Sequence, residues 1–247
     1  MSINGPEELH GMRAAGAVVR QILEAMKRCV RPGVSTAELD EVGAGVMREQ
    51  GARSAPALVY QFPGANCISV NEEAVHGIPG KRELRSGDLV KLDVTIEKDG
   101  FMADAAITVP VGEVTEESRR LAECAERAFT KAMLVARAGF RVSEIGRVVE
   151  REVRRSGFAV IRDLSGHGIG RTIHEDPRVP NFPDPRANQV LTEGLVITVE
   201  PIIAAGSGRT VVAKDGWTVV TADRRPSAHY EHTLVITKGA PMLLTAA

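Results

Sequence analysis

The chain has 247 residues, of which 43% are hydrophobic and 26% are charged, the composition of a globular protein with a sizeable core. Its 31 basic and 32 acidic residues give a formal net charge of -1 at pH 7, which excludes the basic footprint of a nucleic-acid-binding protein. No apolar run marks a secretory signal or a membrane span, and Cys29, Cys67 and Cys124 are too scattered for a disulfide framework, so we expect a reduced, cytoplasmic protein with no nucleic-acid and no membrane partner.

Helical periodicity dominates the first fifty residues. Apolar residues recur at helical spacing from Pro6 to Val30, and Pro32-Gly33 ends this helix. Ser35 precedes Glu38 by three positions, which is the pattern of a capping box. A second helix therefore begins there and stops near Gly51.

The middle of the chain changes to a strand pattern. Apolar alternation through Leu92, Val94 and Ile96 predicts strands between residues 88 and 111, with a tight turn at Asp99-Gly100 or one position earlier. The elements expected after this hairpin are helices at about 115–139 and 142–157, and strands at 194–204 and 230–237.

The helical segments repeat at a constant offset of 106 positions (137 − 31). The first copy has Arg31, Gly33, Glu38, Leu39, Val42, Arg48 and Gly51, and the second has Arg137, Gly139, Glu144, Ile145, Val148, Arg154 and Gly157. Matches among Leu, Ile and Val arise by coincidence between amphipathic helices, but matching glycines at both ends favour two related halves. We predict one domain over residues 1–247, with halves at about 7–113 and 114–240 around a shared site.

Asp93 and Asp104 are the first candidates for that site, because unpaired carboxylates are costly to bury in apolar strands. Paired positions of a two-residue hairpin sum to an odd number, so the two side chains point to the same face. They lie directly opposite if Lys98-Asp99 is the turn, and are diagonal neighbours if Asp99-Gly100 is the turn. Either water solvates this polar face of the hairpin, or the two carboxylates, which repel each other, hold one or two cations between them.

Histidines form the second group of candidates. Glycines on both sides of His167, in the segment Gly166–Gly170, allow close backbone approach and hold the imidazole in position. His174 follows seven residues later and can reach the site without binding metal. His76 precedes a glycine in a loop that ends in Pro79, and it is either a further site residue or an ordinary turn residue. The remaining histidines are assigned to helix surface (His10) and to strand packing (His229 and His232).

Two glutamates complete the set. Glu200 ends an apolar run and Glu231 begins another, and glutamates in such strands are seldom buried unless paired. The predicted metal ligands are Asp93, Asp104, His167, Glu200 and Glu231. Four carboxylates and one imidazole suit Mn, Fe, Co or Zn, and bridging carboxylates suit a dinuclear site.

These residues lie in a series of short motifs: Asn71–Pro79 (NEEAVHGIP), Lys91–Val94 (KLDV), Asp99–Phe101 leading to Asp104, Gly166–Gly170 (GHGIG), Thr198–Pro201 (TVEP) and Tyr230–Thr233 (YEHT). Together they closely resemble the type I methionine aminopeptidases in their short bacterial form, from about residue 8 to residue 238. The resemblance implies an α+β pita-bread (creatinase/aminopeptidase) fold, which is pseudo-two-fold, with curved antiparallel sheets covered by two helix pairs.

The resemblance also implies a mechanism. The five predicted ligands would bind two divalent metal ions (Co, Mn, Fe or Zn), and a metal-bridging water or hydroxide would attack the scissile carbonyl. By similarity Glu200 is the general base, His174 stabilises the oxyanion, and His76 hydrogen-bonds the scissile amide.

The substrate and its pocket follow from the same resemblance. The substrate would be the N-terminal methionine of nascent polypeptides and peptides, before a small second residue such as Ala, Gly or Ser. The family further implies a monomer, with a transient contact to the ribosome. By similarity the substrate-binding residues are Tyr60, Phe62, Cys67, His76, Ile173, His174 and Trp217.

Other enzymes of this fold fit the sequence less well. Prolidases and aminopeptidase P carry an additional N-terminal domain, whereas the first repeat helix here begins by about residue 7. A type II methionine aminopeptidase needs a long helical insertion, and only 30 positions separate Pro201 from Glu231 (231 − 201). A non-catalytic relative would lack metal ligands, and all five are present.

Overall fold

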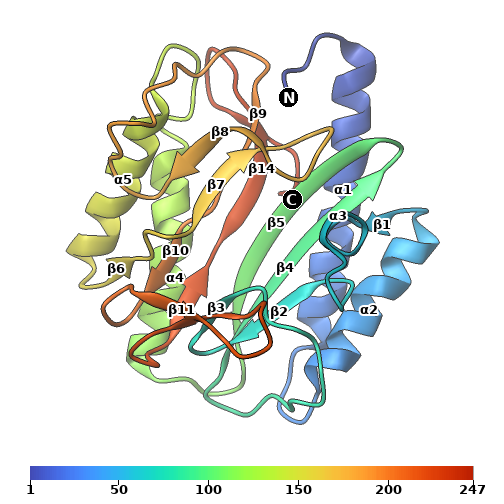
Figure 1. Ribbon diagram of the computed structural model, residues 1–247, viewed down its shortest axis with the longest axis vertical. Coiled ribbons are helices and arrows are strands. Elements are labelled where there is room, and N and C mark those ends of the chain that lie inside the picture. Colours follow the sequence, from blue (N-terminus) through green and yellow to red (C-terminus); the bar gives the residue numbers. More distant parts are fainter. Residues whose placement is uncertain (247) are drawn as a thin grey trace.

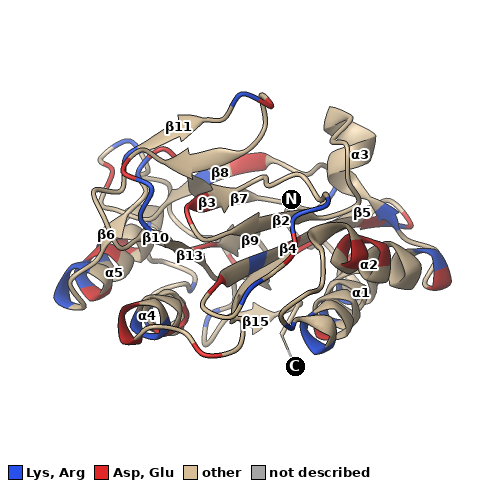
Figure 2. Cartoon of the chain, turned by 90° about the horizontal axis from the view of Figure 1, so that it is seen from below, with Lys and Arg blue, Asp and Glu red and all other residues tan. Residues whose placement is uncertain are grey.

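Two pairs of helices lie along one side of a long antiparallel sheet (Figure 1). The computed structural model describes residues 1–246. The first pair is α1 (Pro6–Cys29) with α2 (Thr36–Glu49), and the second pair is α4 (Glu116–Ala132) with α5 (Val142–Arg155). A short helix, α3 (Ala55–Tyr60), lies on the other side of the sheet (Figure 2).

Both helix pairs show the same local chemistry at their second helix. At α2 the predicted capping box is confirmed, because the Glu38 carboxylate accepts from the Ser35 N–H at 2.8 Å and the Ser35 hydroxyl accepts from the Glu38 N–H at 3.2 Å. At α5 the Glu144 carboxylate accepts from the Arg141 N–H at 2.9 Å. The repeated glycines have positive φ: Gly33 88°, Gly139 91°, Gly51 63° and Gly157 85°. The residues repeated in the two helix pairs therefore serve the same backbone conformations. The division of the chain into two related halves stays a prediction.

The main sheet has nine strands in the order β1-β4-β5-β14-β9-β7-β8, with β2 on β4 and β15 on β14. Its strands are β1 (Arg53–Ser54), β2 (Cys67–Val70), β4 (Leu89–Lys98), β5 (Phe101–Pro110), β7 (Ser165–Gly168), β8 (Glu175–Pro180), β9 (Val196–Val199), β14 (Glu231–Val235) and β15 (Met242–Leu243). Two three-stranded sheets complete the structure: β13 (Ser227–His229), β10 (Ile202–Ala204) and β6 (Ala159–Val160), and β11 (Thr210–Val212), β12 (Val219–Thr221) and β3 (Glu73–Val75).

The β4–β5 hairpin decides between the two turns left open by the sequence. Lys98 pairs with Phe101, so Asp99 and Gly100 form the turn. Their φ angles of 51° and 82° are both positive, as a type I′ turn requires. In this register Thr95 lies opposite Asp104, and the two aspartates are diagonal neighbours on one face of the sheet.

Two predicted elements are shorter than expected. The helix expected over 115–139 ends at Ala132, where the Leu134 and Val135 N–H groups donate to carbonyls three residues back instead of four. The strand expected over 194–204 is broken into β9 and β10, which belong to different sheets. The break falls at Glu200-Pro201, where proline has no N–H for a strand ladder.

Each helix pair buries an apolar stripe against the sheet. One core contains Ile22, Met26, Leu39, Val94 and Ile96 from the α1–α2 side. The other contains Leu121, Phe129, Ile145, Val149 and Val153 from the α4–α5 side. Full burial of one such side chain contributes about 1.5–3 kcal/mol to folding. Lys, Arg, Asp and Glu lie on the outward faces of these helices (Figure 2), which leaves the opposite face of the sheet for a site.

Within residues 1–246, every helix is too short or too polar to cross a lipid bilayer.

Two helix glycines give a matched test of the packing between α5 and its neighbours. A Cβ at Gly146 would lie 2.2 Å from the Phe182 carbonyl oxygen, a backbone atom that cannot move aside cheaply. We expect Gly146→Ala to lower the free energy of unfolding by about 1–3 kcal/mol. At Gly45 in α2 a Cβ would meet only the flexible end of Arg48, at 3.8 Å. Gly45→Ala should therefore raise the free energy of unfolding by about 0.5–1 kcal/mol. Urea denaturation measures both, and equal effects would contradict the packing argument.

Candidate active site

A cavity of about 250 Å³ opens among the strands and loops on the side of the main sheet away from the four long helices. Its lining includes all the residues that the sequence predicts for the site: Tyr60, Phe62, Cys67, His76, Asp93, Asp104, His167, Ile173, His174, Glu200, Trp217 and Glu231. The structure therefore brings them together from distant parts of the chain. Their individual roles stay predictions.

The five predicted metal ligands come from five consecutive strands of the main sheet. In spatial order β4 carries Asp93, β5 carries Asp104, β14 begins with Glu231, β9 is followed by Glu200, and β7 carries His167. Neighbouring strands lie about 4.8 Å apart, so inward side chains on adjacent strands lie close to one another across the cluster. The sheet order itself assembles the cluster.

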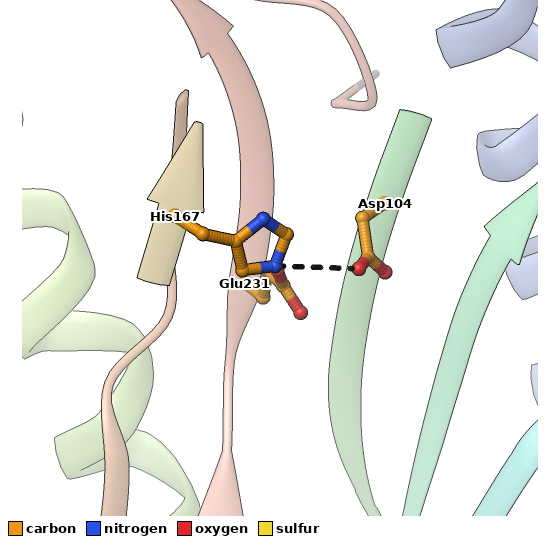
Figure 3. Close-up of side chains that lie close together, drawn as sticks. All are labelled: Asp104, His167 and Glu231. Carbon is orange, nitrogen blue, oxygen red and sulfur yellow. Dashed lines mark ion pairs between the residues drawn. The ribbon is translucent and has the colours of Figure 1, made fainter. Parts of the chain in front are cut away.

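Three of these side chains, Asp104, His167 and Glu231, lie close together (Figure 3). The Nε2 atom of His167 lies 4.0 Å from Oδ2 of Asp104 and 3.7 Å from Oε2 of Glu200. Donor atoms of Asp104, His167 and Glu231 all lie within 4.8 Å of one another. Three donor atoms at such separations can be shared by one ion.

His167 is held by backbone contacts that only glycine neighbours permit. A Cβ at Gly166 would lie 2.5 Å from the Thr198 carbonyl oxygen, and one at Gly168 would lie 2.2 Å from the Asp176 carbonyl oxygen. The His167 N–H donates to the Thr198 hydroxyl at 3.1 Å, and its Nδ1 lies 2.9 Å from the Gly168 carbonyl oxygen. Since a carbonyl oxygen can only accept, Nδ1 carries the proton and Nε2 turns its lone pair towards the carboxylates.

The carboxylates are crowded and poorly solvated. Burial raises the pKa of Asp104, Glu200 and Glu231 well above the usual range. Repulsion adds to this effect, chiefly from Asp93 on Asp104 and from Glu231 on Glu200. Burial also raises the pKa of Asp93, which is only half-buried.

The imidazole does not compensate this charge. Burial, with a smaller effect of His174, lowers the pKa of His167 to about 4, so the ring is neutral at pH 7. Asp104 Oδ1 and Glu231 Oε1 are buried and have no hydrogen-bond partner among residues 1–246. A neutral nitrogen donor, four carboxylates and two orphaned oxygens fit divalent cations such as Mn, Fe, Co or Zn.

His174 borders the cluster without belonging to it. Its Nδ1 lies 2.6 Å from the Tyr60 hydroxyl, and its ring centroid lies 4.3 Å from that of His167. Desolvation in the cavity, and next the neighbouring His76, lower the pKa of His174. Glu175 anchors the loop by accepting from the Arg171 and Thr172 N–H groups at 2.7 and 2.9 Å.

His76 reaches the cavity from an unusual backbone conformation. Its φ is 58°, a left-handed value that side-chain-bearing residues seldom adopt. A Cβ on the following residue, Gly77, would lie 2.3 Å from the Ile68 carbonyl oxygen, so the loop packs directly on β2. Desolvation, and next His229, lower the pKa of His76, which favours the neutral ring.

Apolar and aromatic side chains form another wall of the cavity. The Phe62 and Trp217 rings meet edge to face, with centroids 5.3 Å apart and an interplanar angle of 83°. Cys67 is buried on β2 opposite Asp93, and burial raises the pKa of its thiol well above the ordinary value. Ile173 is also buried and lies beside His174 in sequence. This wall has the character of a pocket for an apolar side chain.

The structure adds to one sequence-based assignment. The sequence assigns His229 to strand or neighbour packing, and the structure also places it in the lining of the cavity, with Nε2 3.2 Å from Oε2 of Glu231. The signal was present, because residues two apart on a strand share a face. His232, one position beyond Glu231, faces the opposite way and packs against Phe129, as predicted. His10 is exposed on α1, also as predicted.

Sequence reasoning also missed Thr198. Its hydroxyl donates to Oε2 of Glu200 at 2.8 Å while accepting from the His167 N–H. One side chain thus fixes two of the predicted ligands. A threonine within an apolar strand carries no obvious functional signal, and its role depends on neighbours brought together by folding.

Comparison with known proteins places this site in a family. Residues 10–238 match the model of metallopeptidase family M24. The chain belongs to metallopeptidase family M24. Within M24, methionine aminopeptidase 2 of Bacillus subtilis is 45% identical over 247 residues, covering 99% of both chains. A crystal structure of the Thermotoga maritima methionine aminopeptidase has a TM-score of 0.96 at 35% identity and covers 100% of both chains.

The M24 comparisons confirm the predicted pita-bread fold and the resemblance to methionine aminopeptidases. The Pyrococcus furiosus prolidase shares the fold, with a TM-score of 0.80 at 23% identity. The match covers 99% of this chain but 65% of the prolidase, so the prolidase has much additional chain. The methionine aminopeptidases match over their full length, and the prolidase does not.

The crowding of carboxylates predicts a stability cost in the metal-free protein. Because the pKa of Asp104 is raised in the folded state, the wild type loses stability as the pH rises above about 4, the unfolded-state pKa. Asp104→Asn cannot ionise, so at pH 7 in chelator it should unfold at higher urea. We expect a gain of about 1 kcal/mol, the usual size of a single-residue effect on stability.

The same variant should bind Mn²⁺ more weakly, which calorimetric titration measures. The stability gain should shrink as the pH falls towards about 4 and disappear about one pH unit lower, where the wild-type carboxyl is protonated in both states. A metal-free Asp104→Asn protein less stable than the wild type at pH 7 would contradict the electrostatic argument.

Proposed function

We propose that the protein is a metal-dependent aminopeptidase that hydrolyses the N-terminal methionine from polypeptides and peptides. The observation that carries the proposal is the convergence of four carboxylates and one neutral imidazole from five consecutive strands beside an aromatic pocket. Relatives in family M24 that share up to 45% identity with the chain are named methionine aminopeptidases. The prolidase activity of other members of this fold has no such support at 23% identity.

In this proposal Asp93, Asp104, His167, Glu200 and Glu231 hold two divalent metal ions. When bound, such ions lower the pKa of water from 15.7 to about 7 and so provide a nucleophile at neutral pH. Glu200 serves as the general base. Its Oε2 already accepts from Thr198, which leaves Oε1 to take up the proton.

His174 serves as the donor to the oxyanion. If the Tyr60 hydroxyl donates to Nδ1 across 2.6 Å, the ring proton lies on Nε2, where it can be donated to the developing charge on the scissile carbonyl oxygen. The lowered pKa keeps the ring neutral with this single donor. His76 hydrogen-bonds the scissile amide from the loop after β3.

The methionine side chain lies in the pocket formed by Tyr60, Phe62, Cys67, Ile173 and Trp217. A flexible thioether contacts aromatic rings favourably, by about 0.3–1.5 kcal/mol for each sulfur–aromatic contact. The cavity is small, at about 250 Å³, which leaves limited room beyond the methionine side chain. We therefore propose a small second residue such as Ala, Gly or Ser.

The cellular role follows from the substrate. The proposed enzyme acts in the cytoplasm as a monomer on the N-termini of nascent chains, with a transient contact to the ribosome. The near-neutral net charge of -1 supports the proposal that neither nucleic acid nor a membrane is its partner.

Methionine release from a Met-Ala-Ser peptide tests the proposed activity. The metal-loaded protein should release methionine, and excess chelator should abolish the release because the nucleophile needs the bound ions. Re-addition of Mn²⁺ or Co²⁺ should restore it. Activity that persists unchanged in chelator would refute the metal mechanism. A Met-Leu-Ser peptide, cleaved as fast as Met-Ala-Ser, would refute the preference for a small second residue.

Replacing His174 tests the oxyanion role. His174→Ala should lower kcat by about 10²–10³, as for the loss of one oxyanion donor, while KM changes little. Steady-state kinetics on Met-Ala-Ser measure both constants. His10→Ala, on the exposed face of α1, provides the control and should leave both constants unchanged. A raised KM with normal kcat in His174→Ala would indicate ground-state binding instead.

A further inference from the structure

His229 is a buried imidazole whose two ring nitrogens have no hydrogen-bond partner in the part of the chain that the structure describes. The residue is 2% exposed, and a buried polar group left without a hydrogen-bond partner destabilises the folded state. His232, also buried, contrasts with it, because its Nδ1 lies 2.9 Å from the Thr245 hydroxyl and its Nε2 lies 3.3 Å from the Tyr230 hydroxyl. The packing around His229 therefore leaves both ring nitrogens available to bind a ligand.

The backbone holds this ring firmly in place. The His229 N–H donates to the Thr108 hydroxyl at 2.8 Å, and that hydroxyl donates to the His229 carbonyl oxygen at 2.8 Å. On its other side His229 pairs with Ile202 of β10. His229 and Glu231 lie two positions apart and both line the cavity. The ring is thus presented to the metal-binding cluster by a fixed strand.

The distance between His229 and Glu231 has a chemical meaning. Nε2 of His229 lies 3.2 Å from Oε2 of Glu231, yet the two atoms lack the alignment of a hydrogen bond. A ring nitrogen and a carboxylate oxygen this close, with no hydrogen bond between them, can both direct a lone pair at one cation.

A shared ion accounts for this separation. Nitrogen and oxygen donors lie about 2.0–2.2 Å from zinc, so two donors on one ion lie about 3.0 Å apart at a right angle and about 3.4 Å apart at the tetrahedral angle. The observed 3.2 Å falls between these values. Glu231 is also the side chain whose other oxygen, Oε1, is buried without a partner.

We propose that His229 is a sixth metal-binding side chain, which supplies a second nitrogen donor to the ion that Glu231 also holds. The inference rests on the proposed function, since it assumes the divalent metal centre. A second imidazole shifts the donor set towards the metals that favour nitrogen, such as Zn, Co and Fe, relative to Mn.

Counting the imidazoles on the metal tests this proposal in the unaltered protein. With Co²⁺ bound, each coordinated histidine labelled with ¹⁵N should give one strongly shifted exchangeable N–H proton resonance. The wild type should show two such resonances, from His167 and His229. His229→Gln should show one, whereas His232→Gln, which alters a buried histidine on the other face of β14, should keep two. A single shifted resonance in the wild type would overturn the proposal.

Metal affinity provides the second measurement. His229→Gln should weaken the binding of Co²⁺ at the lower-affinity site by about 100-fold or more. Replacing even a residue outside the coordination sphere lowers metal affinity by about 10–100-fold, so the loss of a direct ligand should have at least as large an effect. Circular dichroism of the metal-free variants establishes that each has folded. Wild-type Co²⁺ affinity in folded His229→Gln would overturn the proposal, and His232→Gln should retain it.

The two proposals fail separately. If the wild type releases methionine in a metal-dependent manner but shows one coordinated imidazole, the inference about His229 is wrong and the proposed function stands. If two imidazoles bind Co²⁺ but no metal restores methionine release, the proposed function is wrong and the sixth ligand stands.

Discussion

The repulsion among four carboxylates in one cavity is the constraint on which this structure depends. Asp104, Glu200 and Glu231 are nearly inaccessible to solvent, and Asp93 is half-buried beside them. In the metal-free protein each carboxylate raises the pKa of a neighbour, and the neutral His167 does not balance the charge. Such an arrangement lowers stability unless cations occupy the cluster, so the fold bears a cost that divalent ions remove.

The rest of the molecule makes that arrangement rigid. Five adjacent strands each carry or adjoin one predicted ligand, and their hydrogen-bonded ladders prevent the side chains from moving apart. Each helix pair buries its own apolar core against the sheet, so a well-packed layer supports the site beneath both helix pairs. Residues outside the predicted set of ligands and substrate-binding residues also position the site. Thr198 orients Glu200, and Glu175 anchors the loop that carries His174.

Much of the site could be predicted from sequence because it uses charged and polar residues that are energetically costly to bury without partners. Aspartates in an apolar hairpin, a histidine between glycines and glutamates at strand ends stand out without any structure. His229 and Thr198 did not stand out, because a histidine or threonine in a strand has ordinary explanations. Likewise the strand over 194–204 reads as continuous, although Pro201 divides it between two sheets.

The sequence by itself determined the local elements, the capping box at Ser35, the shared face of Asp93 and Asp104, and the family to which the motifs belong. These follow from short-range rules, since helical spacing, strand alternation and glycine conformations act over a few residues. Only the tertiary structure decided the turn at Asp99-Gly100, the order of the five ligand-bearing strands, and the position of His229 beside Glu231. The strand order depends on pairing between distant segments, such as β5 with β14, where His232 pairs with Ala105 (232 − 105 = 127 positions apart), and no local pattern specifies such pairing. The turn and the position of His229 were locally possible, and the packing of the sheets selected them.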